Sequence, residues 1–462
     1  MSLFKKILYN LPEVEGPTQK RLSFKEKLKW TLIILVIFYV MGLVPLFGLG
    51  QNALQQFEYL SIILGASFGS LISLGIGPIV TGSIVLQLLN GSGIVHFDLQ
   101  NPEGKKTFQG TQKLLAIGFI IFEAIVYVMM GGLAPDPLLQ GTQAYGSLQF
   151  ILIFQLCLGG LLILFMDEVV TKWGFGHGVS LFIAAGVSQE IFVRAFSPLR
   201  ASGGQGEYIG AVFRMVHSFA TQNPQEAVLA LSAIIATVLV FVIAVYAQSM
   251  KVEIPLSFGR VRGYGMRWPL SFIYTSNIPV ILVAALLANI QLWARLLENW
   301  GHPILGTFVG NSPATGLVAW IYSPDIVGKL IRGSFTYGDL VPALIYVLFM
   351  VGGSVLFSIF WVQTSGMDAK SQAKNIMSSG LQIPGFRRDQ RVLERVLSRY
   401  IGPLTVMGAV VVGFLAALAD LSGALSRGTG ILLAVMIIYK LYEEIAKQHM
   451  MDIHPAMRKF ME

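Results

Sequence analysis

Cysteine is almost absent from this sequence of 462 residues, which contains Cys157 alone. One cysteine excludes an intrachain disulfide framework and a cluster of thiolate metal ligands. The six histidines are scattered without the spacing of metal ligands, so no metal site is expected. The sequence has no G-x-x-x-x-G-K-S/T motif and no G-x-G-x-x-G after a strand. We therefore expect a protein that is not an enzyme and needs no cofactor.

Charge is also scarce, because Asp, Glu, Lys and Arg make up 13% of the residues, whereas 54% are hydrophobic. A soluble domain has no interior large enough to hide so much apolar surface. The apolar residues are gathered into blocks of roughly 17–25, the length that a helix needs to cross a bilayer. The first residues, 1–29, are too polar for a secretory signal, so we expect no cleavage.

The apolar blocks number ten, which predicts an all-α membrane protein with about ten transmembrane helices. They are Trp30–Leu46, Ile76–Leu89, Leu114–Met130, Leu148–Met166, Val179–Phe192, Ala227–Tyr246, Ile278–Leu292, Leu340–Trp361, Ile401–Leu418 and a block centred on Ile431–Tyr439. An even number of spans returns both termini to one side. Two groups of five spans, the second starting from the opposite face, have the form of an inverted repeat.

The loops on the side of the termini hold 26 of the 33 Lys and Arg residues, and the loops on the other side hold 7. By the positive-inside rule, both termini are expected in the cytoplasm and the chain in the cell membrane. The expected parts are a cytoplasmic N-terminal segment (1–29), a first half (30–200), a second half (201–445) and a cytoplasmic tail (446–462).

The stretch Tyr59–Val95 has no charged residue and is too long for one crossing. Several glycines and Pro78 divide it, because proline removes a backbone hydrogen bond and glycine weakens a helix. We expect a short, loosely held helix around Phe57–Ser70 on the external side and a span from Ile76. Such a piece survives at membrane depth only if protein shields it or it lines a cavity. A single helix kinked at Pro78 is the alternative.

Few ionisable residues are expected inside the membrane, where Glu123 lies well within a block and Glu190 lies near the end of another. Such residues mark ion paths in pumps, and a lone carboxylate is a poor proton relay. Two long cytoplasmic loops, Met250–Phe272 and Gln363–Tyr400, carry basic tips. Arginine and glycine on an exposed loop suit phosphate. For one basic loop a topology signal or a lipid contact is the commoner role, but two on one face favour a large anionic partner.

Several long motifs occur in an order that resembles the SecY family, the large subunit of the Sec translocon. They are Gly75–Thr81, Leu181–Val187, Ser276–Ile281 and Ala288–Trp293. The resemblance extends from Pro12–Glu15 to His454–Ala456, essentially the whole chain. The Pro-Glu-Val-Glu start, Val252–Pro255 and Pro403–Met407 resemble the archaeal branch more than the bacterial one.

The resemblance implies a channel of two five-helix halves around a central pore, which opens across the membrane for secreted chains and sideways into lipid for membrane segments. The family's pore constriction corresponds to six apolar residues, Ile76, Val80, Val179, Ile183, Ile281 and Leu433. An apolar constriction resists wetting. The family's plug corresponds to the segment near 57–70, with Phe57, Ile62, Ile63 and Phe68. Without the family, periodicity cannot single out these residues from those that face lipid.

The family's lateral gate corresponds to Thr81, Glu123 and Asn289, and ordinary packing of polar side chains between helices is the alternative role. The family's ribosome-docking loops correspond to the two basic loops, with Arg260, Arg262, Arg387 and Arg388 at their tips.

The partners that the resemblance implies are a small single-span SecE-type subunit, a second small beta-type subunit, the ribosome, signal peptides with nascent chains, and membrane lipid. Because no motif in the chain uses energy, we expect a passive channel that a partner drives. Two other classes remain possible from the residues alone. A secondary transporter with broken helices predicts clustered ion ligands, which are scarce here. A pore-free anchor for ribosomes leaves the broken second block unexplained.

Overall fold

The structure is a computed structural model that describes residues 8, 10–19, 22–52, 67–91, 93–95, 97, 101–200, 207–258, 265–275, 278–309, 312–378, 381–382, 389–426 and 428–453. Each of the ten apolar blocks coincides with a long helix. These are α2 (Phe24–Leu43), α4 (Gly77–Gly91), α5 (Pro102–Met129), α6 (Gln143–Trp173), α7 (Gly178–Phe196), α9 (Pro224–Ser249), α10 (Ile278–Asn299), α13 (Leu340–Thr364), α15 (Gln390–Leu421) and α16 (Gly428–Ile453). Among the described residues, seven helical segments are long and apolar enough to cross a membrane.

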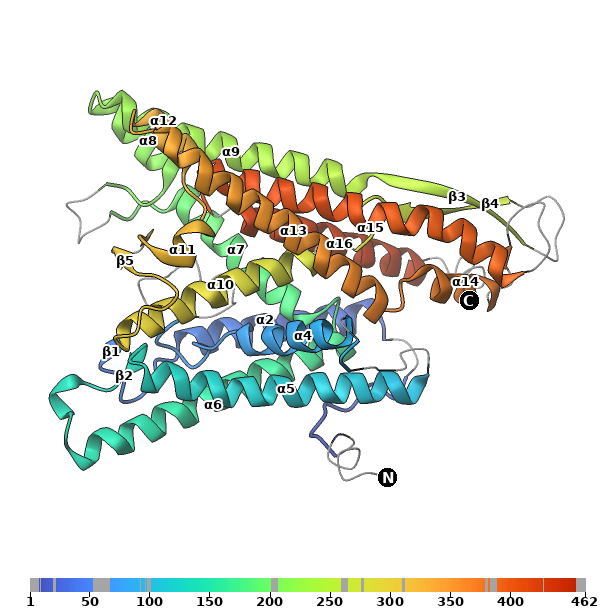
Figure 1. Ribbon diagram of the computed structural model, residues 1–462, viewed down its shortest axis with the longest axis horizontal. Helices are drawn as coiled ribbons and strands as arrows, with labels where there is room; N and C mark the ends of the chain where they lie inside the picture. The colour runs from blue at the N-terminus through green and yellow to red at the C-terminus, as the bar shows by residue number, and fades with distance from the viewer. Residues whose placement is uncertain are drawn as a thin grey trace.

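The long helices form two groups that lie along each other. Figure 1 shows α2, α4, α5 and α6 on one long side of the molecule and α9, α13 and α15 on the other, with α7, α10 and α16 toward the middle. We call α2 and α4 to α7 the first group, and α9, α10, α13, α15 and α16 the second group. The expected all-α, two-group architecture is therefore confirmed.

The helices differ in how much apolar surface they expose. On α9, apolar side chains such as Val238 and Val242 are exposed, whereas most of α10 is buried. Lipid is as apolar as these side chains, so an outward apolar face needs no protein cover in a bilayer. The packing places α10 in the interior of the molecule and α9 at its periphery.

Shorter elements connect the long helices. The helical ones are η2 (Pro137–Leu139), α8 (Ala211–Ala220), α11 (Gly316–Trp320), α12 (Ile326–Ile331), η4 (Tyr337–Asp339) and α14 (Ala369–Ser378). The strands are β1 (Gln51–Asn52), β2 (Leu133–Ala134), β3 (Lys251–Phe258), β4 (Gly265–Ser271), β5 (Phe308–Val309), β6 (Ser312–Pro313) and β7 (Leu381–Gln382). All the strand pairs are antiparallel, in the order β1-β2, β4-β3-β7 and β5-β6.

The uncharged second block is divided at Gly75, where the backbone has a φ of 58°. A positive φ suits glycine and ends a regular helix. The helix α4 then begins at Gly77, so Pro78 lies in its first turn, where the missing N–H costs no hydrogen bond. The alternative of one helix kinked at Pro78 is therefore wrong.

The described part of the segment expected to be a loose helix, Ser67–Ser70, forms turns instead. The Ser73 hydroxyl accepts a hydrogen bond from the Gly69 N–H at 2.9 Å, and the Ser70 hydroxyl donates to the Ser67 carbonyl at 2.6 Å. Serine side chains that bind nearby backbone compete with helix hydrogen bonds. Of the predicted plug residues, Phe57, Ile62 and Ile63 lie outside the described residues.

The N-terminal strap, residues 12–15, lies against the end of α6 and also contacts α5, where Lys113 donates to the Pro12 carbonyl. The Val14 N–H donates to Glu168 at 2.9 Å, and the Trp173 indole donates to the Glu15 carbonyl at 2.9 Å. The Lys172 ammonium pairs with Glu13 and holds the pKa of that carboxyl below its usual value. The strap therefore fixes the start of the chain to the first group.

The start of α2 and the end of α16 meet at the same end of the molecule, where Gln448 donates to the Leu22 carbonyl at 2.9 Å. The first strand of the hairpin is there too, because Lys251 pairs with Glu443 of α16 at 2.9 Å. We call this end, with β3, β4 and α14, the terminal end. The opposite end, with β1, β2, α8 and α12, is the far end (Figure 1).

Candidate functional site

The six predicted pore residues come from four places in the chain. Ile76 directly precedes α4, and its carbonyl accepts from the N–H of Val80, four residues on, at 3.0 Å. Val179 and Ile183 stand four residues apart on one face of α7. Ile281 lies on α10, and Leu433 lies on α16.

The structure brings these six residues into one apolar cluster at the centre of the molecule. Five of them are buried, and Val179 is half-buried against the same cluster. Both helix groups contribute, since α4 and α7 belong to the first group and α10 and α16 to the second. The apolar side chains of this cluster therefore fill the space between the two helix groups.

The three predicted gate residues lie where α4 and α5 face α10, a contact that we call the seam. Asn289 of α10 donates from Nδ2 to the Thr81 hydroxyl of α4 at 2.9 Å. The Thr81 hydroxyl in turn donates to the Gly77 carbonyl at 2.8 Å. Because the Thr81 hydroxyl donates its hydrogen to Gly77, it can only accept in the hydrogen bond across the seam, and Asn289 is the donor.

Glu123 of α5 is 1% exposed and lies beside Thr81. Among the described residues, neither Asn289 Oδ1 nor the Tyr127 hydroxyl has a hydrogen-bond partner. A buried polar atom without a partner costs about 1–3 kcal/mol. Some buried polar atoms of the closed seam thus make no hydrogen bond, and this lowers the free energy needed to separate α4 and α5 from α10.

An aromatic pair that sequence reasoning missed lies next to the seam. The rings of Phe122 on α5 and Trp293 on α10 stack with centroids 5.4 Å apart and planes at 24°. Such pairs contribute about 0.5–1.5 kcal/mol beyond area burial. Phe122 directly precedes Glu123 and Trp293 lies one turn after Asn289, a signal from which the pair could have been found.

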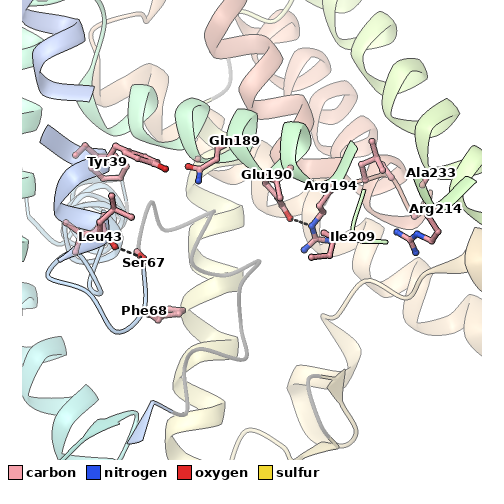
Figure 2. Close-up of a pocket in the computed structure, with 18 of the residues that line it drawn as sticks. Tyr39, Leu43, Ser67, Phe68, Gln189, Glu190, Arg194, Ile209, Arg214 and Ala233 are labelled. Atoms are coloured by element: carbon pink, nitrogen blue, oxygen red, sulfur yellow. Dashed lines mark hydrogen bonds and ion pairs between the residues drawn. The ribbon is translucent and has the colours of Figure 1, made fainter. Parts of the chain in front are cut away.

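A cavity of about 890 Å³ lies between residues of α2, α7, α8 and α9 (Figure 2). Tyr39, Leu43, Ser67 and Phe68 line one wall, so the one predicted plug residue that the structure describes faces this cavity.

The opposite wall carries charge from α7, where Arg194 Nε pairs with Glu190 at 2.9 Å (Figure 2). Ser426, just before α16, donates to the other Glu190 oxygen. Glu190 thus ties the first group to the second on the side away from the seam. The sequence indicated Glu190 only as an intramembrane carboxylate.

The two predicted docking loops lie at the terminal end. Their arginines Arg260, Arg262, Arg387 and Arg388 are outside the described residues. The strands that lead to them are paired, because Ser257 of β3 stands opposite Gln382 of β7 in an antiparallel register. The first loop contains a hairpin, β3 and β4, that the sequence analysis treated as a plain loop.

The part of the chain that the structure describes holds no group of three or more His, Cys, Asp or Glu residues that could bind a metal ion.

Comparisons with known proteins agree with this geometry. The SecY family profile matches residues 70–442. The protein translocase subunit SecY of Methanothermobacter thermautotrophicus is 44% identical over 462 residues, covering 99% of this chain and 98% of the relative. That of Pyrococcus horikoshii is 41% identical over 463 residues, covering 97% and 96%.

Two solved structures have the same fold across the chain. A protein-conducting channel superposes with a TM-score of 0.83 at 42% identity, and 99% of each chain is covered. Sec61 from the canine ribosome-channel complex gives 0.80 at 40% identity, also with 99% of each covered. The fold and its central apolar cluster thus define a protein-conducting membrane channel, not an enzyme. The chain belongs to the SecY family, and the archaeal resemblance read from its motifs is confirmed.

Proposed function

We propose that this chain forms the pore through which unfolded, signal-bearing polypeptides cross a membrane, and that apolar segments leave it sideways through the seam. One observation carries the proposal. The apolar cluster that holds the six predicted pore residues reaches from the first helix group to the second, and the hydrogen bond from Asn289 to Thr81 spans the seam. When the two groups move apart, the passage that they enclose opens across the membrane along the pore axis and sideways toward lipid.

The proposed constriction consists of Ile76, Val80, Val179, Ile183, Ile281 and Leu433. Apolar side chains resist wetting, so the empty pore hinders ions. They also offer a passing chain no polar partners to which it would adhere. The six residues fit this role because both helix groups contribute them and all six belong to or pack against one apolar cluster.

The proposed plug is the segment near 57–70 that precedes α4. In a SecY structure 42% identical to this chain, the plug domain stabilises the closed state and maintains a membrane seal. Phe68 lies at the wall of the cavity of about 890 Å³, and this position supports a similar role here.

The proposed lateral gate is the seam, with Thr81, Glu123 and Asn289 as its latch. Polar side chains paired across membrane helices contribute roughly 0.6–2 kcal/mol. That range suits a latch, because a signal segment with favourable lipid contacts can outweigh it.

The proposed partners follow from the family and from charge. The chain works with a small single-span SecE-type subunit and a second small beta-type subunit, and it receives nascent chains from a ribosome. Sec61 and the yeast Ssh1 complex were each solved with ribosomes. The arginines at the two loop tips suit the phosphates of ribosomal RNA. In this assignment both termini and the terminal end lie in the cytoplasm, the halves are 30–200 and 201–445, and the membrane is the cell membrane.

Reconstitution tests the proposal. The full complex is placed in proteoliposomes and given ribosome-bound nascent chains, either with a signal or with a matched signal in which the apolar core is replaced by polar residues. We expect the signal-bearing chain to become protected from protease, and a chain with a transmembrane segment to resist alkaline extraction. If neither chain is protected or inserted beyond the matched control, the proposed function is wrong.

A further inference from the structure

Short connections join the last two helices of each group, and they lie at opposite ends of the molecule. Residues 174–177 connect α6 to α7 at the terminal end, where the rings of Phe175 and Phe24 are 5.6 Å apart. Residues 422–427 connect α15 to α16 at the far end, next to Asp325, the N-cap of α12. In each group these are the fourth and fifth helices, so the two connections are equivalent positions of an inverted repeat.

The residues that directly precede α7 and α16 are histidine and arginine, which are not among the preferred helix caps. Within the described part of the chain, His177 occupies the N-cap position of α7 and its side chain makes no capping hydrogen bond. The side chain of Arg427, before α16, has no acceptor atom. Because the first N–H groups of a helix have no partner inside it, each helix needs an acceptor from elsewhere.

In both groups that acceptor is an aspartate of the preceding helix. The Val179 N–H of α7 donates to Asp167 Oδ1 of α6 at 2.9 Å. The Thr429 N–H of α16 donates to Asp420 Oδ1 of α15 at 2.8 Å. Val179 and Thr429 are each the second residue of their helix, so the same bond occurs at the two equivalent positions. A carboxylate placed there also faces the positive end of the helix dipole.

Close contacts hold each aspartate against the helix that it caps. A methyl group added at Gly178 would lie 2.6 Å from the Asp167 Cα and 2.8 Å from its Oδ1, so glycine is needed for this approach. Asp420 Oδ2 accepts from the Tyr346 hydroxyl of α13 and from the Thr429 hydroxyl. Tyr346 and Thr429 are both buried, so water does not compete for these bonds.

Each cap lies one turn before a residue of the proposed constriction. Ile183 follows Val179 by four residues, and Leu433 follows Thr429 by four residues. Both Ile183 and Leu433 are 1% exposed and belong to the central apolar cluster. Successive residues of a helix are about 100° apart around its axis. If the carboxylate bound the neighbouring N–H instead, the helix would turn by about that angle, and the side chain would leave the constriction.

We infer that Asp167 and Asp420 are positioning residues that set the rotation of α7 and α16 about their axes, and so direct Ile183 and Leu433 into the constriction. The inference rests on the proposed constriction and deepens it, because it names the groups that hold two of its side chains in place. A role in stability alone would loosen both helices when either aspartate is replaced. Positioning affects only the helix that the aspartate caps.

The first test measures the placement of each helix in the full channel complex in nanodiscs, with Cys157→Ala as background. One sample carries spin labels at Phe154 of α6 and Phe192 of α7, and we call these the first pair. Another carries them at Phe414 of α15 and Tyr442 of α16, the second pair. All four positions are exposed. The measured quantity is the distribution of distances between the two labels of a pair.

Asp167→Leu should shift or broaden the distribution of the first pair and leave the second unchanged, and Asp420→Leu should do the reverse. The Asp167→Asn and Asp420→Asn variants should restore the parent distributions, because the amide oxygen still accepts the backbone N–H. The matched control is Thr405→Val, which removes a buried hydroxyl that donates to Ile401 within α15, and it should change neither pair. The inference is wrong if neither leucine variant alters its own pair, or if each alters both pairs alike.

The second test measures the ion conductance of the resting complex in planar bilayers. Each leucine variant should raise the conductance roughly 2- to 30-fold, the change in the ratio of displaced to correctly placed helix that the loss of one cap causes. The asparagine variants and Thr405→Val should match the parent. Ile281→Asn, which changes the constriction itself, is the positive control.

The outcomes separate the caps from the constriction. If Ile281→Asn leaks and both leucine variants stay as tight as the parent, the inference is wrong. If Ile281→Asn also stays tight, the proposed constriction fails, and the distance distributions alone decide whether the aspartates place their helices. Should a leucine variant fail to fold, the alanine variant at the same position, which adds no bulk, is measured in its place.

Discussion

Replacing Asn289 with leucine tests the latch across the seam. The substitution removes the 2.9 Å hydrogen bond to Thr81, whose hydroxyl keeps its bond to the Gly77 carbonyl. It leaves no new unpaired group, and the lost bond is worth at most roughly 0.6–2 kcal/mol to the closed state, because the unpaired Asn289 Oδ1 is removed with it. At 1.4 kcal/mol for each factor of ten, the open fraction rises roughly 3- to 30-fold.

The assay is insertion of a graded series of signals that differ in their number of leucines. A leucine at the centre of a membrane helix contributes about 0.3–0.6 kcal/mol on the insertion scale. The hydrophobicity threshold for Asn289→Leu should therefore fall by roughly one to seven leucines. Thr81→Val should act in the same direction, and the double variant should show less than the sum, because both changes break one bond.

Thr111→Val is the matched control, since its hydroxyl donates to the Thr107 carbonyl within α5. It should leave the threshold unchanged. Identical thresholds for the parent and Asn289→Leu across the whole series would refute the latch. Additive effects in the double variant would mean that the two residues act separately, as ordinary packing does.

Four further results are expected. Ile76→Asn or Ile281→Asn, combined with deletion of residues 57–66, should raise the ion conductance of the resting channel in planar bilayers, because a polar ring is easier to wet; a channel as tight as the parent would remove these residues from the seal. Arg260→Glu with Arg387→Glu should weaken ribosome cosedimentation and flatten its salt dependence, since fewer phosphates are neutralised, and equal binding at two salt concentrations would contradict docking. The N-terminal strap should stay attached above the ordinary glutamate pKa of 4.5 and loosen as the pH falls through the lower pKa of Glu13 in the folded state, because Lys172 stabilises only the ionised carboxyl. The rate of proteolysis of the strap should therefore rise as the pH falls. Glu13→Gln should abolish this pH dependence. Gly159→Ala should destabilise the protein by about 1–3 kcal/mol through overpacking, because the new methyl would lie 1.8 Å from the Leu71 carbonyl oxygen. Gly118→Ala should leave the stability unchanged, because its methyl would have nothing within 4 Å. Equal thermal stability of the two variants would count against the packing at Gly159.

The ten membrane helices were predictable because each needs a long apolar run, which is a local signal. The start of α15 was missed, since its first turns are charged on one side and present Leu393, Leu397 and Ile401 on the other. A search for apolar blocks does not register such an amphipathic turn. The hairpin β3 and β4 was missed for a similar reason, because its alternating pattern is short and contains Pro255.

The candidate site was less accessible to the sequence. Burial against lipid and burial against another helix demand the same apolar side chains, so periodicity does not distinguish a pore residue from its neighbours. The constriction and gate residues came from the family resemblance. The stack of Phe122 on Trp293 and the bond from Tyr274 to Met367 join residues far apart in the chain, and only three-dimensional packing brings them together.

The constriction is built from residues at both ends of the chain, and this has a consequence for biosynthesis. Val80 and Leu433 are separated by about 350 residues, which a ribosome adds in roughly 20–70 s at about 5–20 residues per second. During the first part of that interval the first group lies in the membrane without α10 beside it, and throughout the interval it lacks α16. Its gate carboxylate Glu123, 1% exposed in the finished protein, has no second group to cover it. A nascent copy of this channel therefore needs shelter from lipid until its last helix arrives, and that shelter is a requirement on whatever machinery inserts it.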